Sequence, residues 1–267
     1  MVCENRPEIL GMAEGALGKE RYTRVMAILE TDSEVKGKAW WGSSSIWEGR
    51  KRTLDVLVSI PSSPIALAAV AVCGAAIIAA ERAEGKTFHS PLVDVGYNLG
   101  PLIGYDTRTH FLKIRTMVPG AQDRESEFCE DGTVFDAKRK KADPRVTKIG
   151  YFIRKLGVVD ELPQLFNVVA GQLSIVGPRQ LARRDMSIVG TMVDREPYKS
   201  YVALHKEGIK PGATGFWAVL ERHSDRPDFE RWLWEEVVYG LEASFKGDLR
   251  IIALTLPVLF KGNSEIK

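Results

Sequence analysis

The chain has 267 residues, of which 45% are hydrophobic and 27% are charged, so it is long enough to form one large or two small domains with a proper core. Its net charge of +2 excludes a polycation of the kind that binds nucleic acid nonspecifically. Three widely spaced cysteines without a CxxC, and four histidines that are not at ligand spacing, argue against a zinc site and predict a reduced, cytosol-facing protein. The charged N-terminus lacks the apolar run of a secretory signal.

The first segment with a clear pattern is 8–30, where apolar residues at a loosely helical period predict one or two amphipathic helices, broken near 15–18. Trp40, Trp41 and Trp47 then precede the basic cluster 50–52. Tryptophan beside lysine or arginine is common at a membrane interface. A small soluble core anchored by the tryptophans is the alternative.

The next segment, 54–80, holds 27 residues and one charge, Asp55. A straight helix of this length would span about 40 Å, more than the roughly 30 Å of bilayer hydrocarbon. Pro61 and Pro64 predict a bend or a break, with the neighbouring serines bonding the freed carbonyls. A kinked span, a hairpin and a buried core helix are the three arrangements to consider. Basic residues flank both ends, which favours two cytoplasmic ends and hence a re-entrant hairpin.

Beyond residue 85 the pattern is globular. Short segments in 90–104 predict strands and turns, 109–118 predicts a strand, and 227–242 predicts a helix. The run 249–261 is too short and too proline-interrupted to span, and we expect it in the plane of the interface. The expected fold class is therefore mixed α/β and helix-rich, with a re-entrant membrane helix hairpin, interfacial amphipathic helices and a small cytosolic catalytic domain.

These patterns divide the chain into three parts. Residues 1–49 form a cytosolic or interfacial extension, 50–82 the membrane hairpin, and 83–267 the catalytic domain.

The pair Asp160-Glu161 is the first candidate for chemistry. It follows the basic stretch 138–155, in which eight lysines and arginines stand against Asp143. Cations attract a polyanion, and a carboxylate pair among them can hold a divalent metal or attack phosphorus. The structural alternative is that Asp160 caps a helix that begins at Glu161 and stops at Gly171.

Three cationic segments supplement this pair. Arg179 ends a Gly-Pro-Arg turn after an apolar run, and its guanidinium could grip a phosphate with two parallel donors or lie solvated. Lys113 and Arg115 share one strand face, which requires an anionic neighbour or water. Lys210 opens the glycine-spaced segment 210–217, which is compatible with a nucleotide-binding loop or with a plain turn.

In chain order, a basic flank and a Ser-Pro-interrupted apolar segment are followed by Lys-x-Arg-Thr-Met, Asp-Glu-Leu-Pro-Gln-Leu-x-Asn-Val, Ser-x-Val-Gly-Pro-Arg and Pro-Gly-x-Thr-Gly-x-Trp. Over 50–262 this order resembles the bacterial sugar transferases, the monotopic phosphoglycosyl transferases. The resemblance implies transfer of a sugar 1-phosphate from a UDP-sugar to polyprenyl (undecaprenyl) phosphate with release of UMP. It implies the first membrane step of exopolysaccharide or other glycoconjugate assembly, on the cytoplasmic face of the bacterial inner membrane.

The implied partners are a UDP-sugar, polyprenyl phosphate and membrane lipids, with no nucleic acid, and a homo-oligomer is left open. The resemblance makes Asp160 the nucleophile of a covalent aspartyl-phosphosugar intermediate and assigns Glu161 to a Mg²⁺ site. The residues it implies in substrate or phosphate binding are Lys113, Arg115, Arg154, Lys155, Arg179, Lys210 and Thr214.

The chain departs from the family pattern near these positions. The family arginine five residues before the nucleophile is Lys155 here, and Arg154 is six residues before it. Gln180 replaces the proline after Gly-Pro-Arg, and Lys210 replaces the arginine before Pro-Gly. The segment 93–100 replaces the usual Gln-x-Arg-x-Gly. The sugar is therefore not specified, and a catalytically weak relative that binds nucleotide sugar or lipid phosphate as a scaffold is the alternative.

Overall fold

The computed structural model describes residues 5–29, 45–85, 92–96, 111–121, 145–179, 195–221 and 228–260. Its α-helices are α1 (Arg6–Leu17), α2 (Lys19–Leu29), α3 (Ser45–Ala83), α6 (Lys148–Lys155), α7 (Gln164–Val169), α9 (Tyr198–Lys206), α10 (Phe229–Glu242) and α11 (Phe245–Phe260). A 3-10 turn, η3 (Val159–Glu161), and a π-helix, η5 (Trp217–Glu221), complete the helical elements of this part. The strands are β1 (Val93–Gly96), β2 (Phe111–Ile114), β3 (Ser174–Val176) and β4 (Gly212–Thr214).

The described strands form two small sheets. β1 pairs antiparallel with β2, and β3 pairs parallel with β4, with Ser174 opposite Gly212 and Val176 opposite Thr214. Helices therefore dominate the structure, as expected, and strands serve mainly to join motifs that are distant in sequence.

The N-terminal segment forms the two predicted helices. α1 ends at Gly18, whose φ of 75° lies in the left-handed region that glycine adopts at no steric cost. Both helices turn an apolar face to the main core. Arg6 and Arg21 form ion pairs with Glu242 and Glu235 of α10, respectively. This segment is therefore packed and charge-paired with the body of the protein.

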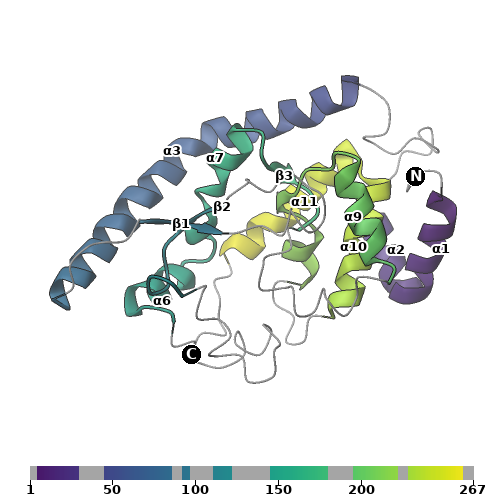
Figure 1. The fold of residues 1–267 in the computed structure, drawn as a ribbon. Helices are drawn as coiled ribbons and strands as arrows, with labels where there is room; N and C mark the ends of the chain where they lie inside the picture. The colour runs from purple at the N-terminus through teal and green to yellow at the C-terminus, as the bar shows by residue number, and fades with distance from the viewer. Residues whose placement is uncertain are drawn as a thin grey trace.

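The apolar segment forms one helix and not the predicted hairpin. α3 runs for 39 residues with Pro61 and Pro64 inside it. Figure 1 shows it along one side of the molecule, changing direction near its middle. A proline removes one intrahelical donor, and the remaining ladder on either side is long enough to keep the chain helical. The expected chain reversal is thus corrected to a bend within a single helix.

Serine hydroxyls bond the α3 backbone, although not at the expected carbonyls. Ser59 Oγ donates to the Asp55 carbonyl at 2.6 Å, and Ser63 Oγ donates to the Ser59 carbonyl at 2.7 Å. The prolines instead remove the donors to the carbonyls of Leu57 and Ile60. Both serines therefore act through the common bond to the residue four positions earlier.

One face of α3 packs on the rest of the protein along its length, and the other is apolar and exposed. Its exposed side includes Leu57, Ile65, Leu67 and Val72. Among the described residues, 49–83 is the one helical stretch long and apolar enough to cross a membrane, and only 22% of its most apolar window is buried. A buried core helix does not fit this exposure.

Two hydrophobic clusters lie beneath α3. The larger joins α1, α2, β3, α9, α10 and α11, with Tyr201, Leu233 and Ile251 completely or almost completely buried. The smaller consists of Cys73 and Ile77 of α3 with Ile114 and Ile153.

The helices predicted near the C-terminus are present. α10 begins at Phe229, after Asp228 caps it by accepting a bond from the Arg231 N–H at 3.1 Å. α11 buries Ile251 and exposes Leu249 and Leu256, so it has the apolar outer face that an interfacial position requires. Trp40 and Trp41 lie outside the described residues.

Candidate active site

Asp160 and Glu161 lie on the short 3-10 turn η3 and not at the start of a long helix. The cap position of this turn is Val158, and α7 begins only at Gln164. Pro163 has no N–H to donate to Val159 four residues earlier, so the chain forms i→i+3 bonds instead, from Glu161 to Val158 at 2.8 Å and from Leu162 to Val159 at 3.4 Å. The capping interpretation of Asp160 is therefore wrong, while the predicted stop at Gly171 is right.

The smaller hydrophobic cluster holds this turn in place. Val159 packs against the cluster that Cys73, Ile77, Ile114 and Ile153 form. Asp160 lies near enough to Cys73 for its charge to act on the thiol. The smaller hydrophobic cluster thus supports the half-buried Asp160 carboxylate next to α3.

Lys113 of β2 reaches the acidic pair. Its Nζ lies 3.0 Å from Glu161 Oε1, with side chains 37% and 31% exposed, respectively. The anionic-neighbour alternative for Lys113 is thereby confirmed. A pair this exposed contributes only about 0–1 kcal/mol to stability, so either partner can exchange the other for a phosphate or a metal ion at low cost.

Arg115, two residues after Lys113, forms its ion pair with a different carboxylate. Its side chain is 4% exposed, and its Nη2 lies 2.6 Å from Glu81 Oε1 near the C-terminal end of α3. The structure therefore brings Lys113 to the acidic pair and ties Arg115 to the helix.

The two adjacent cations of α6 differ in direction. Arg154 is half-buried and donates from Nε to Thr116 Oγ1 at 2.9 Å. Lys155 is exposed, with its Nζ 4.8 Å from the Tyr151 ring centroid. A Cβ on Gly150 would lie 1.9 Å from the Thr116 carbonyl, so only glycine allows α6 to approach this strand end. Arg154 is consequently the cation of the two that faces the Lys-x-Arg-Thr-Met segment.

The Val-Gly-Pro-Arg and Pro-Gly-x-Thr-Gly motifs lie against each other, backbone to backbone. The Gly177 N–H donates to the Thr214 carbonyl at 3.0 Å, and the Gly212 N–H donates to the Pro178 carbonyl at 2.9 Å. A Cβ on Gly212 would lie 2.1 Å from the Gly177 nitrogen. The Gly212 amide is thus committed to this pairing and does not face a ligand. Thr214 Oγ1 bonds Thr255 Oγ1 at 2.8 Å, and Lys210 is exposed.

Arg179, which follows this pairing, is stacked rather than simply solvated. Its guanidinium carbon lies 3.5 Å from the Trp217 ring centroid and 5.5 Å from that of Trp232. Its carbonyl accepts a bond from the Tyr201 hydroxyl. Stacking restricts the guanidinium plane, and the planar fork of a guanidinium matches a planar anion.

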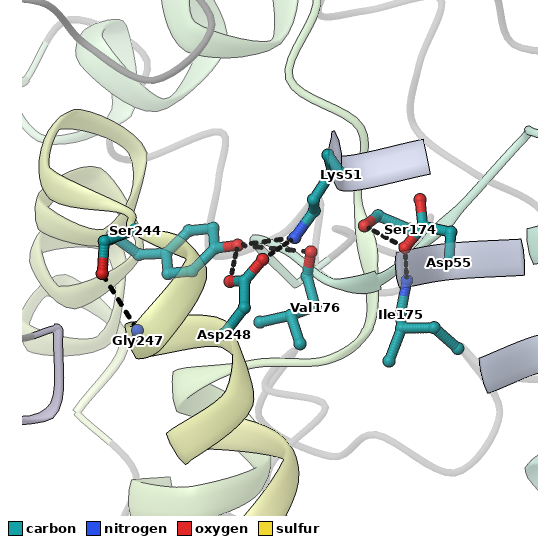
Figure 2. Close-up of polar contacts among 9 residues, drawn as sticks. Lys51, Asp55, Ser174, Ile175, Val176, Ser244, Gly247 and Asp248 are labelled. Atoms are coloured by element: carbon teal, nitrogen blue, oxygen red, sulfur yellow. Dashed lines mark hydrogen bonds and ion pairs between the residues drawn. The ribbon is translucent and has the colours of Figure 1, made fainter. Parts of the chain in front are cut away.

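The structure also shows buried polar residues that hold the elements of the site together and that the sequence motifs did not indicate. Figure 2 shows Asp55 accepting bonds from Ser174 Oγ and the Ile175 N–H, each at 2.8 Å, from a carboxylate that is 2% exposed. The same view shows Lys51 paired with Asp248. The other Asp248 oxygen accepts a bond from the Tyr239 hydroxyl at 2.8 Å. The available signal was that Asp55 is the single charge in an apolar segment, which ordinarily indicates a paired residue.

Burial governs the titration of this network. It raises the pKa of Asp248, while the Lys51 charge and hydrogen bond oppose the shift. The Asp248 charge adds to burial in raising the pKa of the Tyr239 hydroxyl well above its usual value. The network therefore holds the Lys51 ammonium near the buried oxygen atoms of Asp248 and Tyr239, and its positive charge stabilises the ionised form of Asp248.

A helix with an exposed apolar face, a carboxylate pair on a tight turn and stacked or half-buried cations are features of a membrane-associated protein with a charged site beside its apolar helix. Residues 46–262 match the family described as bacterial sugar transferase, and the chain belongs to that family.

Individual relatives agree with this membership. The chain is 35% identical over 153 residues to the galactosyl transferase CpsE of Streptococcus agalactiae, covering 57% of this chain and 31% of that protein. It is 40% identical over 132 residues to the undecaprenyl-phosphate glucose phosphotransferase of Komagataeibacter xylinus, covering 47% and 24%. It is 30% identical over 167 residues to the exopolysaccharide production protein ExoY of Sinorhizobium fredii, covering 59% and 66%. The chain thus spans about a third or less of the first two relatives.

Proposed function

We propose that the protein transfers a sugar 1-phosphate from a UDP-sugar to polyprenyl (undecaprenyl) phosphate and releases UMP. The observation that carries the proposal is the half-buried Asp160-Glu161 turn held against α3, with Lys113 beside it, in a chain of the bacterial sugar transferase family. The names of its relatives, which include an undecaprenyl-phosphate glucose phosphotransferase, support the same donor and acceptor classes.

The reaction proceeds in two displacements. A carboxylate oxygen of Asp160 bonds to the sugar-bearing phosphorus, the bond from that phosphorus to the bridging oxygen breaks, and UMP leaves with the electron pair. An oxygen of polyprenyl phosphate then attacks the same phosphorus, and the Asp160 carboxylate leaves. The products are polyprenyl diphosphate sugar and the restored enzyme.

The cations contribute by neutralising and orienting phosphates. Lys113 is next to Glu161, Arg154 is held by Thr116, and Arg179 is fixed on Trp217. Oriented cations in a partly dry site stabilise charge that develops on phosphate oxygens.

The residues present fit a magnesium ion. No group of three or more possible ligands exists among the described histidines, cysteines and acids, but Mg²⁺ is usually bound by one or two carboxylates together with substrate phosphates. Glu161 and the adjacent Asp160 offer such carboxylates. Lys113 can give up its ion pair with Glu161 at low cost, because that pair contributes little to stability. A bound ion would neutralise diphosphate charge.

The proposed topology is monotopic, with both ends of α3 on the cytoplasmic face of the inner membrane. Its support is that Lys51 and Asp55 near one end and Glu81 near the other contact the same body. A helix crossing a bilayer would separate these contacts. The test is labelling of Trp47→Cys and Arg82→Cys in intact cells, in a background without native cysteines. Protection of both positions is expected, and labelling of only one would refute the topology.

The reaction is tested with purified protein, undecaprenyl phosphate, Mg²⁺ and a panel of UDP-sugars, following UMP release. We expect turnover with at least one sugar, loss on chelation and recovery with Mg²⁺. Mass spectrometry should find the sugar phosphate on the peptide that contains Asp160. Binding of a UDP-sugar without UMP release would instead identify a scaffold, and activity independent of any divalent ion would refute the Glu161 site. Exopolysaccharide assembly is the expected pathway class, as the name of the S. fredii relative suggests.

A further inference from the structure

A buried carboxyl of α10, Glu236, contacts the groups that surround Arg179. Its side chain is inaccessible to solvent, and its Oε1 accepts a bond from the Trp232 indole N–H at 2.7 Å. The backbone N–H groups of Arg179 and Trp217 lie close enough to this carboxyl to lower its pKa, and its second oxygen, Oε2, is buried without a hydrogen-bond partner. Glu236 thus links three points: the arginine's backbone and both tryptophans over which its guanidinium lies.

The tryptophans form a fixed pocket for the guanidinium. The rings of Trp217 and Trp232 have centroids 5.8 Å apart at an interplanar angle of 65°, and the Arg179 guanidinium carbon lies over both. Trp217 belongs to η5 and Trp232 to α10, so their mutual position depends on what joins these elements. Glu236 accepts a bond from Trp232 and lies close to the backbone N–H of Trp217.

Glu236 is suited to this role as a neutral acid. Burial raises its pKa to about 8, and the nearby charge of Glu235 adds to the shift, whereas the three N–H contacts oppose it. Glu235 has its own cation, Arg21 of α2. Within the described part of the chain Glu236 forms no ion pair. A neutral acceptor can fix Arg179 without drawing its positive charge away from an anionic ligand.

We propose that Glu236 is a positioning residue that sets the Arg179 guanidinium for the phosphate of the nucleotide sugar by bonding Trp232 and lying against the backbone N–H groups of Arg179 and Trp217. The inference rests on the proposed function, because Arg179 needs a phosphate ligand for the positioning to matter.

The first experiment requires no substrate. Hydrogen exchange followed by mass spectrometry is measured on the full-length parent, Glu236→Gln and Glu236→Leu proteins. Glutamine keeps a neutral oxygen acceptor, so protection of the amides at Arg179 and Trp217 should stay near the parent level. Leucine removes the acceptor, so exchange in those peptides should accelerate at least roughly tenfold, as expected for the loss of a buried hydrogen bond. Unchanged exchange in Glu236→Leu would overturn the proposal.

The second experiment separates positioning from general destabilisation. In Glu236→Leu the KM for the UDP-sugar should rise roughly tenfold while kcat changes less. In the separate variant Glu236→Gln the KM should stay at the parent value. Leu233→Ala, a cavity variant of the same helix, provides a matched loss of stability. An equal rise of KM in Leu233→Ala would reduce Glu236 to a structural role and overturn the proposal.

A double-mutant cycle tests whether Glu236 acts through Arg179. If it does, Glu236→Leu should raise KM little further in an Arg179→Ala background. Full additivity would contradict the proposal. A parent protein without UMP release would instead defeat the proposed function, and the exchange experiment would still decide whether Glu236 holds the Arg179 backbone.

Discussion

The two ends of α3 meet carboxylates of opposite character. Near the N-terminal end, Asp55 and Asp248 are almost completely buried, and their hydrogen-bond donors come from β3, α3 and α10. Toward the C-terminal half, Asp160 and Glu161 are only partly buried, on a three-residue turn beside a small apolar cluster. Buried carboxylates that are saturated by protein donors are costly to disturb, whereas half-exposed ones can exchange partners. The comparison predicts that one end of the helix governs stability and the other governs chemistry.

The largest effect is expected on turnover at the exposed end. Asp160→Asn should lower UMP release by at least roughly 10³-fold, because an amide cannot act as the nucleophile. The melting temperature should stay unchanged, since the side chain is not buried in the core. Turnover and thermal unfolding of the same preparation test both statements. Parent-like UMP release would contradict the covalent assignment.

The next effect concerns stability at the buried end. Lys51→Met should cost about 3–5 kcal/mol, because it leaves Asp248 without its cation. Asp248→Asn in the same chain should recover part of that loss, since the uncompensated charge disappears. Chemical unfolding of the two single variants and the double variant in detergent measures the free energies. A loss below about 1 kcal/mol in Lys51→Met would remove the contrast between the two ends.

A smaller effect is expected from pH. The pKa of Glu236 is about 8 in the folded protein against an ordinary value of 4.5, so its contribution is complete below pH 4.5 and is lost as pH rises through 8. The free energy of unfolding of the parent should therefore decline between pH 6.5 and 8.5 more steeply than that of Glu236→Gln. His205, whose pKa burial lowers to about 4, destabilises the fold only as pH falls below 6.5. If the free energy of unfolding declined equally steeply in the parent and in Glu236→Gln between pH 6.5 and 8.5, Glu236 would not be a neutral acid in the folded protein.

The smallest expected effect is the difference in kcat/KM between variants of two neighbouring cations, Arg154 and Lys155. Arg154→Ala should lower kcat/KM roughly tenfold, because its guanidinium is oriented by Thr116 near the acidic turn. Lys155→Ala should change it less than about twofold, because that side chain is exposed on Tyr151. Steady-state kinetics of both variants with one UDP-sugar test this difference, and a larger effect of Lys155→Ala would assign the role of the family arginine to Lys155.

Much of the fold follows from local signals. Glycine at position 18 ends α1, the apolar run before Gly177 forms β3, and α10 follows its capping aspartate. These features depend on backbone conformation and short-range periodicity, both of which are present in the sequence itself.

The parts that sequence did not yield depend on distant partners. Nothing local indicates that Arg115 pairs with Glu81, or that Asp55 meets Ser174. The 3-10 turn at Asp160 did have a local cause in Pro163, but capping preference at Asp160 suggested a longer helix. The prolines indicated an interruption of the apolar segment, but proline chemistry alone does not decide between a bend within one helix, as in α3, and the expected hairpin.

The packing of α3 also bears on how this protein can be produced. Leu54, Ala66 and Ile77 are buried against the body, so deletion of the helix removes core material along with the apolar surface. A truncated cytosolic fragment would expose the smaller cluster and leave Arg115 and Ser174 without their α3 partners. A water-soluble version therefore calls for selective replacement of the outward side chains Leu57, Ile65, Leu67 and Val72 by polar residues, with the inward face retained.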